Sequence, residues 1–129
     1  MSGYQQDAAP STVTDVRVAL TVSNAGTATA TLTAAQLLGR VIYTTPAAAA
    51  NLTLPTAALL VAADDKAETG TGFIVDLANR SSANVATLVA GTGVTLSGTA
   101  AVGVSSSARL YVRYTNVTSG AEAYDVIRL

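Results

Sequence analysis

Three carboxylates in the second half of the sequence come closest to a catalytic pattern. A glycosidase needs two carboxyl groups that face each other across a cleft, with the pKa of one raised so that it can donate a proton. The predicted strands that carry these carboxylates also carry three arginines, which supply cationic partners across the strands. We therefore predict cross-strand or intersubunit ion pairs rather than catalysis for this set, which comprises Asp76, Glu122, Asp125, Arg109, Arg113 and Arg128.

The other residue types that perform chemistry near neutral pH are missing or badly spaced. The chain has no His and no Cys, which removes disulfides, thiolate metal sites and the commonest general base. The charged stretch from Asp64 to Gly72 lacks the ligand spacing of a metal loop, so we predict a solvated loop. Gly70–Gly72 and Gly91–Gly93 resemble phosphate loops, but no helix and no Lys follow them, so we predict tight turns between strands. We predict no enzymatic activity, no cofactor and no metal.

One face of the predicted strand near the C-terminus carries alternate Arg and Tyr residues. Arg109, Tyr111 and Arg113 share this face, while the opposite face of the strand is apolar. Alternate Arg and Tyr can stack on sugar rings or nucleotides, but the same residues are also enriched in protein interfaces. Because the chain has no Trp and no second aromatic cluster, we predict an interface rather than a carbohydrate site.

Composition indicates one small domain with a thin core. A chain of 129 residues suits a single domain, and half of its residues are hydrophobic, but it has only one Phe and one Met. Ala and Val, which bury little surface each, supply most of the rest. Such a core is marginal for a monomer, and a mean hydropathy of +0.42 is high for a freely exposed surface. We predict a homo-oligomer, with a homotrimer as the expected state.

The charge balance and the hydropathy profile exclude two classes of partner. Seven basic and eight acidic residues give a formal net charge of −1, whereas a nucleic-acid binder needs clustered Lys and Arg. The longest unbroken apolar run, Ala57–Ala63, is far shorter than the about 20 residues that span a bilayer. The first residues also lack the basic and apolar regions of a secretory signal. We expect neither a nucleic-acid nor a membrane partner.

The N-terminal part of the sequence predicts an extended arm followed by a strand. Residues 1–11, which include Tyr4 and Pro10, are polar and have no apolar periodicity, so we expect an interface arm that anchors on a neighbouring subunit. From Thr12 to Val22 the residues alternate, with Val16, Val18, Leu20 and Val22 on one predicted half-buried face. The turn residues that follow suggest a hairpin with the run Thr27–Thr33.

The remaining sequence, taken with Thr12–Val22, predicts an all-β domain over residues 12–129, with a β-sandwich or barrel-like architecture and one short helix. The helix is expected from Thr56 to Ala63, after Pro55, while Thr33–Gly39 could close as a single helical turn between Thr33 as cap and Gly39 as stop. Strands are expected at Arg40–Thr45, at Asn51–Leu54, through several short runs, and in a final hairpin with a turn at residues 117–120. The run Phe73–Asn79 alternates as well, with Phe73, Val75 and Leu77 expected on one face.

Three stretches of the sequence resemble small structural proteins of tailed bacteriophages. They are NLTLPTAALLVAA from Asn51, GTGFIVDLANRSSANVATLVAGTGVTLSG from Gly70, and SSARLYVRYTNVTSGAEAYDVIRL from Ser106. The resemblance implies a role on the virion surface, as a head decoration (cement) protein or a fibre base, often trimeric. It brings no catalytic motif, and it does not explain the first forty residues.

Two functions from different classes follow as expectations. The first is a structural virion protein that binds the major capsid protein at the capsid surface and stiffens the shell. The second is a receptor-binding or carbohydrate-binding module of a phage head or tail fibre. An N-terminal arm that contacts the shell would favour the first, and a pocket lined by Arg109, Tyr111 and Arg113 would favour the second.

Overall fold

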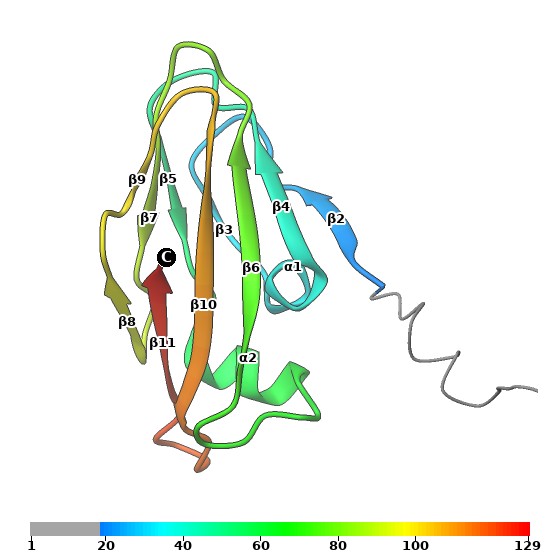
Figure 1. The fold of residues 1–129 in the computed structure, drawn as a ribbon. Coiled ribbons are helices and arrows are strands. Elements are labelled where there is room, and N and C mark those ends of the chain that lie inside the picture. The colour runs from blue at the N-terminus through cyan, green and yellow to red at the C-terminus, as the bar shows by residue number, and fades with distance from the viewer. Residues whose placement is uncertain (1–18) are drawn as a thin grey trace, which may run out of the picture.

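The computed structural model describes residues 19–129, which build two β-sheets and two short helices (Figure 1). The predicted arm 1–11, with Tyr4 and Pro10, lies outside the described residues, as do residues 12–18 of the first predicted strand. The prediction of a mainly β domain is confirmed for the described part of the chain.

The larger sheet has six strands in the order β2-β4-β6-β10-β11-β8. They are β2 (Thr21–Asn24), β4 (Arg40–Thr44), β6 (Gly72–Asn79), β8 (Val94–Ser97), β10 (Ser106–Asn116) and β11 (Ala123–Arg128). The first three run parallel to one another, and β8 runs parallel to β11. Strand β10 is antiparallel to both of its neighbours, and the predicted final hairpin is confirmed as β10 and β11.

The smaller sheet has four strands in the order β3-β5-β7-β9 and lies behind the larger one in Figure 1. They are β3 (Ala30–Thr31), β5 (Ala50–Thr53), β7 (Ala86–Val89) and β9 (Ala101–Val102). Strands β3, β5 and β7 are parallel, and β9 is antiparallel to β7. From β2 to β10 each successive strand therefore belongs to the other sheet, so the chain winds back and forth between the two layers.

This winding makes the predicted hairpin between Thr12–Val22 and Thr27–Thr33 wrong, because β2 and β3 lie in different sheets. A turn does form at Asn24–Gly26, as the turn residues suggest, but the chain then crosses to the other sheet instead of returning along β2. Gly26 takes a left-handed conformation with φ 98°, and its N–H donates to the side chain of Asn24 at 2.8 Å. The Gly26 carbonyl then accepts from the Thr45 N–H at 3.1 Å, which ties the turn to the end of β4.

The core lies between the two sheets and collects side chains from both. The alternation predicted for β6 and β10 is confirmed: Val75, Leu77 and the apolar face of β10 are buried, whereas the outward residues are half-buried or exposed. Phe73, on the inward face near the start of β6, is half-buried. Because β10 pairs with β6 in register, with Leu110 opposite Val75, the buried side chains of the two strands form one continuous row. The largest buried side chains are Tyr114 and Tyr124, so two tyrosines supply the volume that the single Phe and the absent Trp do not.

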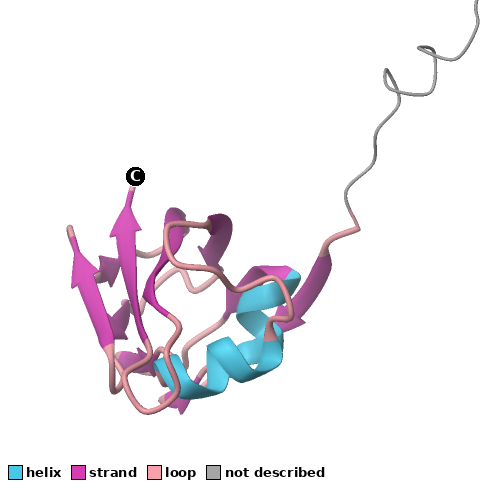
Figure 2. Ribbon diagram, turned by 90° about the horizontal axis from the view of Figure 1, so that it is seen from below, coloured by secondary structure: helices cyan, strands magenta, loops and turns pink. Residues whose placement is uncertain are grey.

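Two helices are present where the fold prediction had one, and both begin at a threonine cap. Helix α2 (Ala57–Ala63) confirms the predicted helix, with Thr56 accepting from the Leu59 N–H. Helix α1 (Ala34–Gly39) confirms the possible helical turn, with a capping box between Thr33 and Gln36. The helices lie next to each other at one end of the domain (Figure 2). Neither has the length or the apolar run needed to cross a bilayer.

Strand β2 contradicts one expectation for the first predicted strand. Leu20 and Val22 were expected on a half-buried face, but their side chains are 51% and 60% exposed. Among the described residues, β2 is an edge strand with β4 as its one sheet neighbour, and no described element covers these two side chains. Apolar residues do alternate along this segment, but the face that carries Leu20 and Val22 is exposed.

Candidate functional site

The face of β10 that is predicted to be an interface lies on the outside of the sheet, with Arg109 and Arg113 exposed and Tyr111 half-buried, and it contains an ion pair. Arg109 lies opposite Asp76 across β10 and β6. Its Nε donates to Asp76 Oδ1 at 2.9 Å, and its Nη2 donates to Oδ2 at 3.3 Å. Both side chains are largely exposed, so the pair contributes little to stability. The prediction of a cross-strand ion pair is confirmed for these two residues.

The other two carboxylates are placed for structure rather than acid/base work. Glu122 accepts from the Gly120 N–H at 3.0 Å and so stabilises the β10–β11 turn. Asp125 lies opposite Arg113 in the strand register, with no ion pair between them within residues 19–129. Arg128 donates to two backbone carbonyls near β9. The three carboxylates therefore do not converge on one cleft.

The two glycine pairs act as turns, as predicted. Gly91 accepts from the Val94 N–H at 3.1 Å in the turn before β8. The Thr92 carbonyl accepts from the first N–H of α2, on Ala57, and the Gly93 carbonyl accepts from Tyr124 in β11. This turn therefore connects the helix to the sheet. Gly70 similarly donates to the Tyr114 carbonyl at 2.8 Å.

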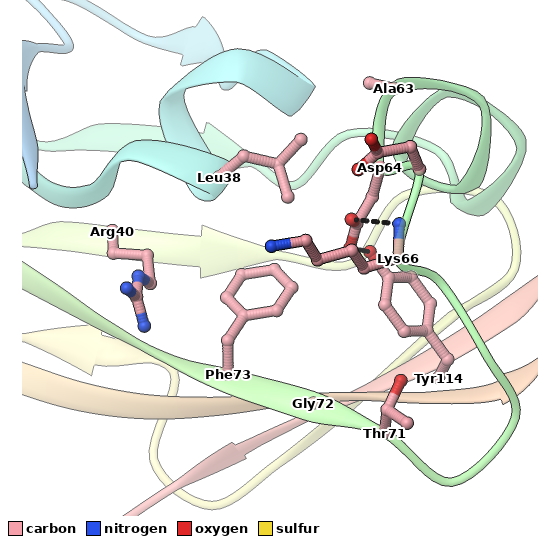
Figure 3. Close-up of a pocket in the computed structure, with 10 residues that line it drawn as sticks. Leu38, Arg40, Ala63, Asp64, Lys66, Thr71, Gly72, Phe73 and Tyr114 are labelled. Atoms are coloured by element: carbon pink, nitrogen blue, oxygen red, sulfur yellow. Dashed lines mark hydrogen bonds between the residues drawn. The ribbon is translucent and has the colours of Figure 1, made fainter. Parts of the chain in front are cut away.

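A cavity of about 610 Å³ opens beside α1, α2 and the start of β6 (Figure 3). Its wall mixes charged, polar and apolar side chains from segments far apart in the sequence. The lining residues are Leu38, Arg40, Ala63, Asp64, Asp65, Lys66, Thr71, Gly72, Phe73 and Tyr114. The predicted solvated loop 64–72 forms much of this wall, which the sequence did not indicate.

Asp64 and Tyr114 form the central contact of this cavity. Tyr114 Oη donates to Asp64 Oδ2 at 2.5 Å, and the other carboxylate oxygen accepts from the Lys66 N–H at 3.0 Å. The Asp64 N–H in turn donates to Leu60 at the end of α2. Asp64 is thus fully engaged in holding the loop and the helix end against β10. We interpret this contact as structural: it fixes the loop to β10.

Burial of Tyr114, reinforced by its hydrogen bond to Asp64 and by the charge of that carboxylate, raises the pKa of its phenol well above the usual range. Burial also raises the pKa of Tyr124, whose hydroxyl donates to the Pro55 carbonyl at 2.6 Å. Both phenols therefore stay protonated in the folded state at pH values where an unfolded tyrosine ionises. A neutral phenol near Asp64 is a hydrogen-bond donor and not a general base.

These shifted pKa values predict that the protein loses stability in alkali. The folded-state pKa of Tyr114 lies above its unfolded value of about 10, so its contribution is fully present below that pH and falls as the pH rises further. We expect the urea midpoint to drop above about pH 10, and Tyr114→Phe to flatten that drop. Asp64→Asn keeps Tyr114 buried but removes the carboxylate charge, so its alkaline drop in urea midpoint should be intermediate between those of the wild type and Tyr114→Phe. An unchanged alkaline slope in Tyr114→Phe would exclude this residue as the cause.

A second hollow of about 670 Å³ lies between α1 and α2 and is lined almost entirely by apolar groups. Leu59, 60% exposed, forms one side of it. The lining residues are Thr31, Leu32, Thr33, Ala34, Ala35, Leu59, Ala62 and Ala63. We call this feature the helix hollow. It holds no charged side chain, so it fits an apolar group and not an ion.

The residues predicted from the sequence as a site do not meet at either cavity. Arg109, Tyr111 and Arg113 share the outer face of β10 but line neither the mixed cavity nor the helix hollow. Neither of the two cavities is therefore the pocket that would favour carbohydrate binding by this face. Tyr4 and Pro10 lie outside the described residues. Within residues 19–129, no three Asp or Glu residues are grouped so that they could hold a metal ion.

The fold and its cavities define a small, mainly β domain with two sheets, a loop at residues 64–72 that is fixed by the contact between Asp64 and Tyr114, and an open apolar hollow. In comparisons with known proteins, no family model, no curated protein and no solved structure matches this chain. Function is therefore inferred from the geometry and from the resemblance in the sequence.

Proposed function

We propose that this protein is a non-enzymatic structural protein of a virion, a capsid decoration or cement protein that binds the major capsid protein as a homotrimer. The resemblance of the chain from Asn51 onward to small phage structural proteins suggests the virion. One structural observation carries the proposed association: apolar side chains are exposed at the edge strand β2 and in the helix hollow, on a chain with little charge. Exposed apolar patches on a small domain are typical of a protein interface.

We further propose that the two sheets are the halves of a β-sandwich. Leu52 and Leu88 of the smaller sheet and Leu77 and Leu110 of the larger one belong to a single buried cluster. Packing of two sheets over one core is the arrangement that defines a sandwich. A rigid two-layer body suits a protein that stiffens a shell, because its surface residues keep fixed positions.

The arm 1–11 is proposed to anchor the protein on the shell. It lacks the apolar residues needed to fold alone, so a partner surface must offset the entropy of ordering it. The N-terminal residue of the described chain, Ala19, is exposed and precedes the edge strand β2. Residues that precede this exposed position can contact a neighbouring molecule without disturbing the core.

The shell assignment is tested with capsids of the virus that carries the gene, stripped of this protein. We expect the full chain to rebind as a homotrimer by light scattering, and a protein lacking residues 1–11 to stay folded and trimeric but to bind at least about tenfold more weakly, a difference of about 1.4 kcal/mol. Equal binding by the truncated protein would contradict the anchoring role. No binding of the full chain would contradict the shell function itself.

A further inference from the structure

We propose that residues 12–20 of one chain bind in the helix hollow of a second copy, with Val16 and Val18 as the apolar contacts. This inference rests on the proposed homo-oligomer and names the contact that would build it. It concerns a different segment from the arm 1–11, which is assigned to the shell.

The path of β2 determines where the preceding residues leave the domain. Strands β2 and β4 are parallel, with Thr21 opposite Arg40, so a residue before Thr21 would have to pair with a residue before Arg40. Helix α1 occupies that position. At its last residue, Gly39, a Cβ atom would lie only 2.8 Å from the Thr21 carbonyl oxygen. The sheet therefore offers the chain no partner strand upstream of Thr21.

The start of β2 points away from the body of the domain in both views (Figures 1 and 2). A return to the helix hollow of its own chain would require a reversal, which needs turn-forming residues. The sequence from Val16 to Val22, VRVALTV, has no Gly, Pro, Asn, Asp or Ser. Its β-branched residues favour an extended conformation over a turn, so a second copy is the partner that we propose for this segment.

The segment and the helix hollow are chemically matched. Leu20 and Val22 are exposed and continue the alternation of Val16 and Val18 in the sequence. The helix hollow presents small and apolar side chains, with Leu59 standing out at its side. Seating valines there would remove apolar surface from water on both partners, which is the main favourable term in association.

The symmetry of this contact agrees with a trimer. The segment on one subunit and the hollow on the next are two different surfaces, so the contact can repeat head to tail, and such contacts form a ring when the rotation between subunits closes. Pairing of two β2 edges would instead join identical surfaces and give a dimer. The contact between segment and hollow is therefore the one that can produce a three-fold ring.

The test uses the full chain, whose lack of Cys permits a clean crosslink. In the double variant Val16→Cys, Ala62→Cys, oxidation should join chains into dimers and closed trimers on a non-reducing gel, because a disulfide forms only when the two Cα atoms come within about 7 Å. The matched control is Val16→Cys with Val104→Cys; Val104 is also exposed but lies in the loop between β9 and β10.

Leu59→Asp supplies a second measurement that does not depend on crosslinking. Leu59 is mostly exposed in the described chain, so the domain should fold normally. The buried charge in the interface should raise the concentration at which the oligomer dissociates by at least about tenfold. Val104→Asp should leave that concentration unchanged.

The outcomes separate the two proposals. A disulfide within a single chain, which leaves the protein at monomer mass on the non-reducing gel, would place the segment in the helix hollow of its own chain and overturn the inference. A stable oligomer that neither crosslinks nor weakens in Leu59→Asp would also overturn it, and it would leave the proposed homo-oligomer intact. A wild-type protein that stays monomeric at micromolar concentration would overturn both.

Discussion

Replacing Asn79 with Asp should lower the free energy of unfolding by about 3 kcal/mol or more at pH 7. Asn79 is buried at the end of β6. Its Nδ2 donates to the carbonyls of Asn84 and Val102 at 2.9 and 3.0 Å, and its Oδ1 accepts from the Ser81 N–H at 2.9 Å. One amide thus ties the end of the larger sheet to β9 of the smaller one. A carboxylate of the same shape would present negative charge to both carbonyls.

The pH dependence of this loss identifies its cause. Burial and the two carbonyls should raise the folded-state pKa of the new carboxyl group above its unfolded value of about 3.9. The protonated variant is therefore the more stable one, and its deficit should grow as the pH rises above that value. Urea unfolding at about pH 4 and pH 7 would measure this difference. The same change at the exposed Asn51 should cost little, and a loss independent of pH would point to a cause other than the buried charge.

Gly93→Ala should cost about 3 kcal/mol, combining left-handed backbone strain with overpacking. Gly93 has φ 80°, and an added Cβ would lie 2.7 Å from the Glu122 carbonyl oxygen and 2.8 Å from the Cβ of Ala57. One contact is to backbone and the other to the first residue of α2, so neither can move cheaply. We expect the thermal midpoint to fall by more than about 10 °C.

Gly120 provides a matched control for this substitution. It has a similar left-handed conformation, with φ 85°, but nothing lies within 4 Å of an added Cβ. Gly120→Ala should therefore cost only the backbone term, about 1 to 2 kcal/mol. Equal losses at both positions would show that the contacts of the turn at residues 91–93 with α2 and β11 do not constrain it.

Local signals in the sequence predicted the elements well. The alternation of β6 and β10 indicated most of the buried side chains, and the cap at Thr33 and the proline at position 55 placed the starts of α1 and α2, because these signals depend only on neighbouring residues. The partner of each strand was less accessible. Asn24 and Gly26 marked a turn correctly, but whether the chain returns along β2 or crosses to the other sheet depends on contacts with Thr45.

The cavities were not predictable for the same reason. Asp64 and Tyr114 are fifty residues apart, and neither stands in a short motif that signals the other. Tyr114 was expected on the apolar face of its strand, which is correct, but its hydroxyl partner comes from a loop that appeared to be solvated. Leu20 and Val22 illustrate a different limit. A periodic pattern identifies the apolar face of a strand, but it does not identify the surface that packs against that face.

The position of β11 in the larger sheet affects how the chain is made. Within residues 19–129, strand β8 pairs in its sheet with β11 alone. Because β11 follows β8 in the chain, with β9 and β10 between them, β8 leaves the ribosome before its sheet partner does. During that interval the nascent chain carries an unpaired strand edge that favours aggregation. For such a protein, yield in a host cell should depend on chaperone supply during synthesis as well as on the stability of the finished fold.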